Sequence, residues 1–303
     1  MTAKQKSPFA LPPIVLKRQL RDLVERALHE DIGRGDLTVQ ALELGRQRSR
    51  AHIVAKSKGI LSGSDAVTAT FRALDSKAKL TWRVTDGKVV RKGMIVAEIY
   101  ATPSALLSGE RTALNFLSRL SGVATTTRDL VDKLKGTHTR LLDTRKTTPG
   151  WRYLEKQAAL TGGAVSHRMG LHDALMIKSN HVVAVGNFEE TVRRAVRNSG
   201  RRTLICEVRS IREIRAALDH GVPWLLLDHF RGQRLRHAIS VIREHDTSQR
   251  KTGAQRTIIE VSGNVDKRSI RSIARYGPDF VSSGGITHSA QAIDFSLRWV
   301  EGR

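Results

Sequence analysis

The spacing of apolar residues divides the chain into two regions of different rhythm. The first region opens with residues 14–29, where Leu16 and Leu20 begin the three- to four-residue repeat of an amphipathic helix. Short apolar runs bounded by turn residues follow, and they predict strands at 52–55, 80–84, 89–90 and 94–100. A second helix is expected to begin near Ser108 and to lead into another domain near Gly122.

Beyond Gly122 short apolar runs alternate with helical stretches such as 211–220 and 270–276. Each apolar run ends in polar or charged residues, or in glycine: residues 143–146, 178, 207, 228, 262–264 and 283–285. Repeated strand–helix units predict a parallel sheet. Candidate functional residues follow every predicted strand, which favours an α/β barrel. In an open doubly wound sheet the ligand-binding residues would cluster at one topological switch point.

These patterns predict an α/β protein with two domains and a short tail. We expect an N-terminal α/β sandwich domain over residues 1–121 and an incomplete parallel α/β barrel over 122–290. A C-terminal helix is expected over 291–303. A chain of 303 residues is long enough to bury a core in each domain.

The charge balance indicates anionic ligands without identifying them. Lys and Arg number 52 against 29 Asp and Glu, which gives a net charge of +23. Such an excess is typical of nucleic-acid-binding proteins, but here it is spread along the chain, with no basic tail and only 5% aromatic residues to stack on bases. A generally basic, solvated surface is the favoured interpretation, and acidic small-molecule substrates or nucleic acid remain alternatives.

Cysteine content and hydropathy exclude several classes of protein. The single Cys206 excludes an intrachain disulfide framework and a Cys-rich zinc site, and its place within an apolar run predicts a buried side chain. No apolar run approaches the ~18 residues of a membrane span. Prolines at 12 and 13 interrupt any signal-peptide core, so we expect a cytoplasmic protein.

The residues at the predicted strand ends suit chemistry on a phosphorylated or acidic substrate. Cations gather there (Arg145, Lys146 and Lys178, with His167 and Arg168 nearby), together with the carboxylates of Glu207 and Asp228. Arginine binds carboxylate and phosphate bidentately, and two oxygen ligands suit Mg²⁺ that bridges phosphates. Glycine-containing loops after late barrel strands often bind phosphate. Each side chain alone could form an ordinary ion pair, so the hypothesis depends on their common location.

Eight sequence blocks are similar to those of one known family. In order they are EDIGRGDLT (30–38), GERTALN (109–115), DTRKTTPG (143–150), HR (167–168), IKSNH (177–181), LD (227–228), SGN (262–264) and THS (287–289). With these blocks the chain resembles quinolinate phosphoribosyltransferase, also called nicotinate-nucleotide pyrophosphorylase (carboxylating), over nearly its whole length. The resemblance implies the sandwich-plus-barrel fold and a homodimer in which the N-terminal domain of one subunit caps the barrel of the other.

The resemblance also implies a reaction and its participants. Quinolinate and phosphoribosyl pyrophosphate would give nicotinate mononucleotide, pyrophosphate and CO₂, with Mg²⁺ as the cofactor, as a step in NAD biosynthesis. This is the chemistry of a pentosyltransferase. No membrane partner is implied, and the even spread of charge does not favour nucleic acid.

Carried over by position, the resemblance assigns roles to individual residues. The two carboxylates of quinolinate would be held by Arg145, His167, Arg168 and Lys178, with Thr144 beside them. Phosphoribosyl pyrophosphate and Mg²⁺ would be served by Lys146, Glu207 and Asp228, the last two as metal ligands. Phosphate would lie on the loops Ser262, Gly263, Asn264 and Ser283, Gly284, Gly285. Arg111 would bind quinolinate in the partner subunit's site. The catalytic set would be Lys146, Lys178, Glu207 and Asp228.

The chain departs from the family pattern near this site. Ile205 takes the place of the first glutamate of the usual Glu-x-Glu, and Arg209 and Arg212 stand at positions that are usually acidic. His229 replaces the usual Asn, and the second phosphate loop reads SGGI (283–286) rather than VGAL.

Three alternatives to the quinolinate enzyme remain open. They are a phosphoribosyltransferase of the same fold on another acidic ring, a paralogue associated with molybdenum transport, and a non-catalytic nucleic-acid-binding protein. The intact pairs Arg145–Lys146 and His167–Arg168 favour the quinolinate enzyme, because a dicarboxylate needs them.

Overall fold

The computed structural model describes residues 9, 13–45, 47–249 and 255–300. Its internal contacts divide the chain into two compact units. We call Met1–Ala10, Asp129–Lys146 and Ala164–Gly285 the barrel unit, and Leu11–Arg128, Thr147–Gly163 and Ile286–Arg303 the sandwich unit. Each unit is assembled from three stretches of sequence, so neither is a continuous segment.

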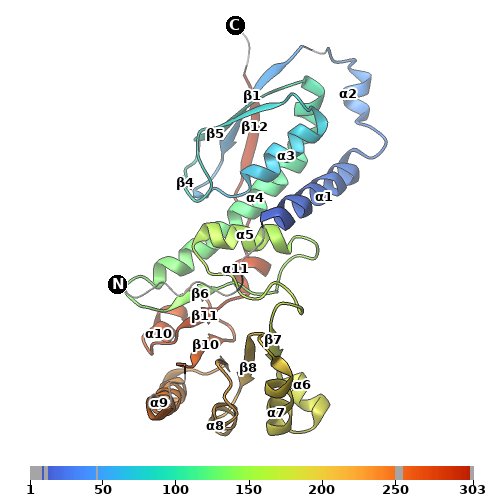
Figure 1. Cartoon of the computed structure of the whole chain (residues 1–303). Coiled ribbons are helices and arrows are strands. Elements are labelled where there is room, and N and C mark those ends of the chain that lie inside the picture. Colours follow the sequence, from blue (N-terminus) through green and yellow to red (C-terminus); the bar gives the residue numbers. More distant parts are fainter. Residues whose placement is uncertain (1–8, 10–12, 46, 250–254, 301–303) are drawn as a thin grey trace. The chain divides into compact units, whose positions relative to one another are not determined.

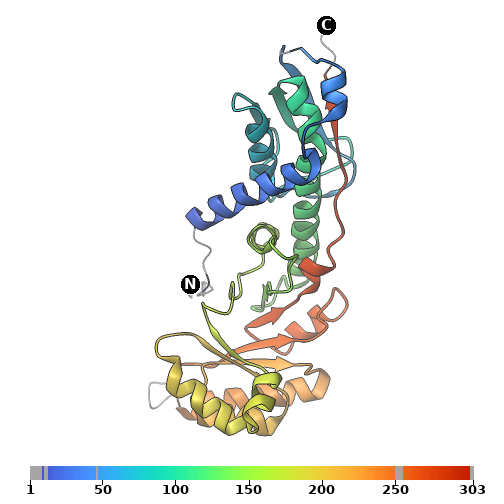
Figure 2. The same cartoon turned by 90° about the vertical axis from the view of Figure 1, so that its right-hand side faces the viewer.

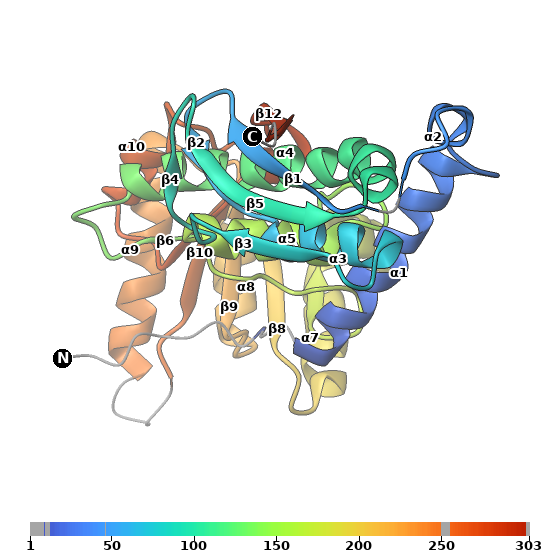
Figure 3. The ribbon, with the colours of Figure 1, turned by 90° about the horizontal axis from the view of Figure 1, so that it is seen from above.

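The sandwich unit contains an antiparallel four-stranded sheet with the strand order β12-β1-β5-β3 (Figure 3). The strands are β1 (Ser49–Ala55), β3 (Lys79–Trp82), β5 (Ile95–Ala101) and β12 (Phe295–Trp299), with a separate ladder of β2 (Gly59–Ile60) and β4 (Val89–Val90). The helices are α1 (Pro13–Ile32), α2 (Leu37–Ala41), α3 (Ser64–Leu74), α4 (Pro103–Lys133) and α5 (Arg152–Gly162).

Alternating small and branched residues place one face of this sheet in the core. Ala51 and Ile53 of β1 and Ile99 of β5 are fully buried, and they pack in one cluster with Phe71 of α3 and Leu117 of α4. This period-two burial is what a sheet covered on one face by helices requires. The early helix and the strands predicted for this region are confirmed.

Two predictions for the ends of the domains are not met. Helix α4 begins at Pro103, before Ser108, and continues through Gly122 without a break. The predicted C-terminal helix over 291–303 is wrong, because residues 295–299 form strand β12. That strand pairs antiparallel with β1 and buries Phe295, so its hydrophobic spacing serves a sheet and not a helix.

The barrel unit is built on a six-stranded sheet in which every neighbouring pair is parallel (Figure 1). Its order is β6-β11-β10-β9-β8-β7. The strands are β6 (Arg140–Leu142), β7 (Leu175–Ile177), β8 (Leu204–Val208), β9 (Trp224–Asp228), β10 (Ile258–Ser262) and β11 (Phe280–Ser282). A single parallel bridge between Leu142 and Val165 extends the sheet beyond β6. The fold is therefore the predicted α/β architecture with an incomplete barrel.

Helices alternate with these strands: α6 (Ser179–Val185), α7 (Phe188–Ser199), α8 (Ile211–Asp219), α9 (Gly232–Gln249), α10 (Ile270–Ala274) and α11 (Gly285–His288). Figure 2 shows α7, α8 and α9 on the outer side of the strands. The side chains of Asn187 and Ser210 cap α7 and α8. Each accepts a hydrogen bond from the backbone N–H three residues later, that of Glu190 or Glu213, and this defines where the helix begins.

The inner face of the barrel carries one residue of every two along each strand. Trp224, Leu226 and Ile205 pack there with Phe280 and with Phe9, a residue far away in sequence. Cys206, on the opposite face of β8, is buried and free, as predicted, and burial raises the pKa of its thiol to about 12. No helix among the described residues is long and apolar enough to cross a membrane.

Candidate active site

The parallel sheet brings the predicted site residues of the barrel unit to one edge. Because the strands run in the same direction, their carboxyl ends lie in the order of the sheet. From β6 to β7 that edge carries residues 143–146, 283–285, 262–264, 228, 207 and 178. His167 and Arg168 follow Val165, which lies beside β6 through its bridge to Leu142. Arg111 belongs to the sandwich unit, where it is exposed on α4.

Strand periodicity explains why these side chains share a face with the core. Glu207 comes two residues after the core residue Ile205, and Asp228 comes two residues after Leu226. Side chains two positions apart in a strand point to the same face. On β8 and β9 the apolar inner face of the barrel therefore ends in a carboxylate.

Arg145 and Arg168 form the most confined positive charge of the site. Arg168 is 5% exposed, and its Nη1 donates to the carbonyl of Ala174, just before β7, at 3.1 Å. Burial lowers the pKa of Arg168, and the nearby charge of Arg145 lowers it further. The Nε of half-buried Arg145 finds no hydrogen-bond partner among the described residues. Arg145 thus keeps one buried donor without a partner in the described part of the chain, beside a second guanidinium group, an arrangement that can bind an anion.

His167 is held by three polar contacts inside the barrel. Its backbone N–H donates to Oδ1 of Asp143 at 2.8 Å, and its Nδ1 accepts the N–H of Arg168 at 2.7 Å. The ring proton therefore lies on Nε2, which faces Oε2 of Glu260 at 3.2 Å. With both nitrogens engaged, His167 fixes the backbone that carries Arg168. The resemblance implies that His167 binds quinolinate, and this stays a prediction; in this structure both ring nitrogens face protein groups.

Glu260 is the functional residue that the sequence analysis missed. It is 1% exposed in the middle of β10 and also accepts the indole N–H of Trp224 at 3.0 Å. Burial favours its protonated form, but the hydrogen bonds that it accepts from His167, Ser282 and Trp224 outweigh burial and hold the pKa of Glu260 below its ordinary value. A carboxylate within the apolar run 258–261 was the available signal, since acidic residues are almost never fully buried unless paired.

Lys178 and Glu207 form an ion pair between the ends of β7 and β8. The Lys178 Nζ lies 3.5 Å from Oε2 of Glu207, whose side chain is 8% exposed. The N–H of Ser179 donates to the other carboxylate oxygen at 3.3 Å. His181, which had no predicted role, accepts the Lys178 N–H on Nδ1 at 2.9 Å. The start of α6 is thus organised around Lys178.

Asp228 and Glu207 both form ion pairs with Arg209. Arg209 Nη2 lies 3.5 Å from Glu207 Oε1, and Arg209 Nε lies 3.8 Å from Asp228 Oδ2. His229 Nε2 lies 3.8 Å from the other Asp228 oxygen, and His229 adopts a left-handed backbone with φ of 57°. Two of the departures from the family pattern, Arg209 and His229, therefore contact predicted ligands directly.

The two glycine-containing loops lie beside these carboxylates. Ser262 pairs with Asp228 in the sheet, and Gly263 has a φ of 89° with no room for a side chain, because an added Cβ would lie 2.8 Å from the His229 ring. Ser283 donates its hydroxyl to the carbonyl of Val265 at 2.7 Å, so that hydroxyl ties the two loops together. The Ser283 hydroxyl is therefore engaged within the fold.

The remaining predicted residues, Thr144 and Lys146, follow β6. The Thr144 hydroxyl accepts the N–H of Lys146 at 3.1 Å, and the Lys146 side chain is exposed. The described residues contain no group of three or more His, Cys, Asp or Glu side chains that could hold a metal ion. Glu207 and Asp228 are thus two carboxylates already faced by cations, a donor set that suits Mg²⁺ shared with substrate phosphates.

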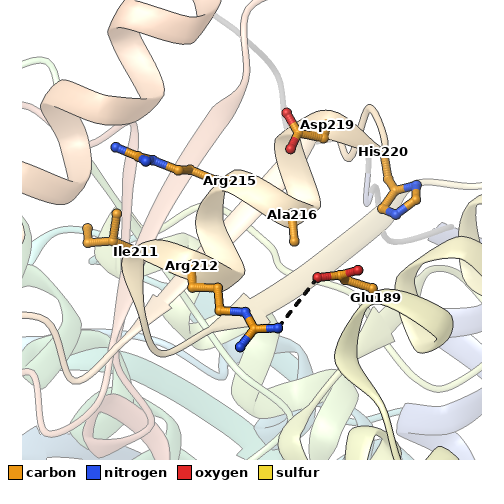
Figure 4. Close-up of a pocket in the computed structure, with 7 residues that line it drawn as sticks. All are labelled: Glu189, Ile211, Arg212, Arg215, Ala216, Asp219 and His220. Atoms are coloured by element: carbon orange, nitrogen blue, oxygen red, sulfur yellow. Dashed lines mark ion pairs between the residues drawn. The ribbon is translucent and has the colours of Figure 1, made fainter.

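A separate surface pocket lies between α7 and α8 and contains none of these residues. It is lined by Glu189, Ile211, Arg212, Arg215, Ala216, Asp219 and His220. Figure 4 shows Arg212 and Glu189 pointing toward one another, and their ion pair spans 3.8 Å with the Arg212 side chain 89% exposed. Arg212 therefore forms an ordinary solvated ion pair, whereas Arg209 contacts the carboxylates of the rim.

Comparison with known proteins agrees with the geometry. The description "Quinolinate phosphoribosyl transferase, C-terminal domain" matches residues 123–298, and "Quinolinate phosphoribosyl transferase, N-terminal domain" matches residues 36–121. A probable nicotinate-nucleotide pyrophosphorylase [carboxylating] of Bacillus subtilis is 37% identical over 92% of this chain and 93% of its own length. A protein of Synechocystis with the same name is 35% identical over 96% and 95%.

A solved structure shows the same arrangement of the whole chain. The nicotinate-nucleotide pyrophosphorylase from Francisella tularensis superposes with a TM-score of 0.86 at 34% identity, covering 96% of this chain and 98% of that one. Similarity at this level covers nearly all of this chain.

Proposed function

The chain belongs to the quinolinate phosphoribosyltransferase family, and we propose that it joins quinolinate to phosphoribosyl pyrophosphate with loss of CO₂. The products are nicotinate mononucleotide and pyrophosphate, so the protein is a pentosyltransferase of NAD biosynthesis. The observation that carries this proposal is the pair of guanidinium groups of Arg145 and Arg168: their charges act on one another, Arg168 is buried, and Arg145 Nε has no hydrogen-bond partner among the described residues.

Quinolinate suits this pair because it carries two adjacent carboxylates on an aromatic ring. Arg145 and Arg168 would bind carboxylate through their planar donor groups, and Lys178 would supply a further cation from the end of β7. His167 acts as a positioning residue, because its nitrogens bind Glu260 and the Arg168 backbone. The buried guanidinium of Arg168 orients the ring relative to the neighbouring strand ends.

The transfer step depends on placed charges. Attack of the ring nitrogen on the ribose carbon develops positive charge on the sugar, while the departing pyrophosphate gains negative charge. Glu207 and Asp228 lie where carboxylates can bind ribose hydroxyls, and Lys146, Lys178 and the two glycine loops can neutralise the phosphates. Holding both substrates at one rim supplies proximity, which is a large part of the rate.

Decarboxylation follows from the product of transfer. Once the ring nitrogen is ribosylated, its fixed positive charge stabilises the carbanion left when the adjacent carboxylate departs as CO₂, and a proton then replaces it. The step demands no general base. The protein's part is to hold the ring while one carboxylate leaves and the other remains bound.

Mg²⁺ is proposed to enter with phosphoribosyl pyrophosphate. Glu207 and Asp228 can contribute oxygen ligands beside substrate phosphates, and the ion would neutralise the diphosphate as it departs. We also propose that the protein acts in the cytoplasm, in line with the expectation from its sequence.

We also propose a homodimer in which Arg111 of each subunit completes the partner's quinolinate site. Arg111 is exposed on α4 and lies in a different unit from the other predicted residues. Two copies related by a two-fold axis would each supply this cation to the other.

The reaction itself tests the proposal. Purified protein with quinolinate carrying ¹⁴C in the carboxylate at C2, phosphoribosyl pyrophosphate and Mg²⁺ should release ¹⁴CO₂ in step with nicotinate mononucleotide. Nicotinate in place of quinolinate is the control substrate, because it lacks the carboxylate that leaves. Turnover of nicotinate but not quinolinate, by protein shown to be folded, would overturn the assignment.

A further inference from the structure

Among the described residues, Arg209 is the cation that forms ion pairs with both predicted metal ligands. It approaches Glu207 at 3.5 Å through Nη2 and Asp228 at 3.8 Å through Nε. The side chains of Glu207 and Asp228 are 8% and 20% exposed, so both carboxylates lie well inside the rim. Charge–charge attraction is stronger at such positions than between fully solvated side chains.

The backbone of Arg209 is held in place from two sides. Its N–H donates to Oε2 of Glu213 at 2.6 Å, and its carbonyl accepts from Nη2 of Arg234. Arg234 in turn stacks on the ring of Phe230, 4.3 Å from its centroid. The next residue, Ser210, caps α8. The guanidinium therefore extends from a fixed base toward the two carboxylates.

Cations already face both carboxylates at this point of the rim, and the charge of Arg231 also acts on Asp228. Glu207 and Asp228 contribute two negative charges, and Lys178 and Arg209 contribute two positive charges within 4 Å of them. A divalent cation added there would meet two cations as well as two carboxylates, so its binding to the protein alone gains little. An incoming diphosphate can instead bind the guanidinium group of Arg209, because that side chain is 54% exposed.

We propose that Arg209 is a specificity-determining residue that binds the diphosphate group directly and replaces part of the contribution of Mg²⁺. The inference deepens the proposed function and rests on it for the identity of the substrate. It predicts that this protein binds pyrophosphate, and the diphosphate of phosphoribosyl pyrophosphate, with little dependence on Mg²⁺.

Calorimetric titration with inorganic pyrophosphate tests this inference without turnover. In wild-type protein the dissociation constant should change by less than about tenfold between EDTA and millimolar Mg²⁺. Arg209→Ala should weaken binding in EDTA by at least about tenfold, the size of a lost charge-assisted hydrogen bond, and should make binding depend on Mg²⁺. Arg209→Glu should strengthen that dependence, and Arg209→Lys should retain part of the EDTA affinity.

Arg212→Ala is the matched control, because Arg212 is three residues away, is 89% exposed and pairs with Glu189 outside the rim. It should leave both affinities unchanged. Wild-type binding that requires Mg²⁺, or equal EDTA affinity in wild type and Arg209→Ala, would overturn the inference. The Arg209 side chain is 54% exposed, so its removal leaves no buried cavity and the variants should fold. Arg209→Gln is a second variant without the charge. Absence of CO₂ release with the pyrophosphate pattern intact would refute the proposed function alone.

Discussion

At the scale of single residues, Glu260 illustrates how a side chain can organise a site that it does not face. Its carboxylate joins His167 to Trp224 inside the barrel, and His167 holds the backbone of Arg168. We expect Glu260→Gln to lower the free energy of unfolding by about 1–3 kcal/mol at pH 7, because a charge-assisted buried contact is replaced by a neutral one. The KM for quinolinate should rise more than the KM for phosphoribosyl pyrophosphate.

The pH dependence of this effect has a defined sign. The pKa of Glu260 is lowered in the folded protein from its ordinary 4.5. A lowered pKa stabilises the fold above the ordinary value, and the contribution is lost as the pH falls through the folded value. Urea denaturation should therefore show the largest difference between wild type and Glu260→Gln near neutral pH, shrinking below pH 4.5. Glu190→Gln, which removes the ion pairs of Glu190 with Arg193 and Arg194 on the surface of α7, should change stability less than Glu260→Gln.

Arg168→Lys tests whether quinolinate binding needs the planar guanidinium group of Arg168 or only its positive charge. Lysine keeps the positive charge but cannot bind Ala174 and a carboxylate with one planar group. We expect the KM for quinolinate to rise by about tenfold or more, with little change for phosphoribosyl pyrophosphate. Steady-state kinetics with each substrate varied in turn would measure this. An equal rise in both constants would instead indicate general disruption of the rim.

Sequence alone indicated which residues gather at the rim but not how they are paired. Lys178, Glu207 and Asp228 could be predicted because each directly follows an apolar run. The contacts of Arg209 with both carboxylates and the link from His167 to Glu260 depend on which strands are neighbours. That order joins segments far apart in the chain, and local spacing does not encode it.

At the scale of elements, β12 shows where hydrophobic spacing was ambiguous. Residues 295–299 are too few to separate a helical repeat from alternation, and the partner that decides the matter, β1, lies far earlier in the sequence. Helix α4 is a second case. Gly122 predicted the link between two domains, but it lies within the helix, where packing requires a glycine. A Cβ at Gly122 would lie 2.1 Å from the carbonyl oxygen of Gln291.

Phe295→Ala tests the role of β12 as a sheet strand. Phe295 is 5% exposed and packs in the sandwich core, so we expect a loss of about 3–5 kcal/mol in the free energy of unfolding. Arg298→Ala, on the same strand but exposed, should cost less than about 0.5 kcal/mol. Urea denaturation followed by tryptophan fluorescence would compare them. Equal effects of the two substitutions would contradict burial of this face.

At the scale of the whole molecule, the two units draw on stretches that are not contiguous. Phe9 belongs to the barrel core, stacked on His167 with centroids 5.7 Å apart, and residues after 285 complete the sandwich unit. Hydrophobic patterning could predict both architectures because each repeats locally. It could not predict which distant segment completes each core. The charge of +23 likewise indicated anionic substrates, while only a few cations at strand ends carry the proposed chemistry.

The dimer makes a quantitative prediction about mixtures of inactive variants. Arg111→Ala removes the cation lent to the partner, and Lys178→Ala damages the subunit's own rim, so each homodimer should have two defective sites. In a mixed dimer the rim with intact Lys178 receives intact Arg111 from the other subunit, which restores one site of two. Half of randomly exchanged dimers are mixed, so activity should recover to about a quarter of wild type. Steady-state rates before and after subunit exchange, with exchange verified by native mass spectrometry, measure the recovery. Mixed dimers that form without activity would show that Arg111 acts elsewhere.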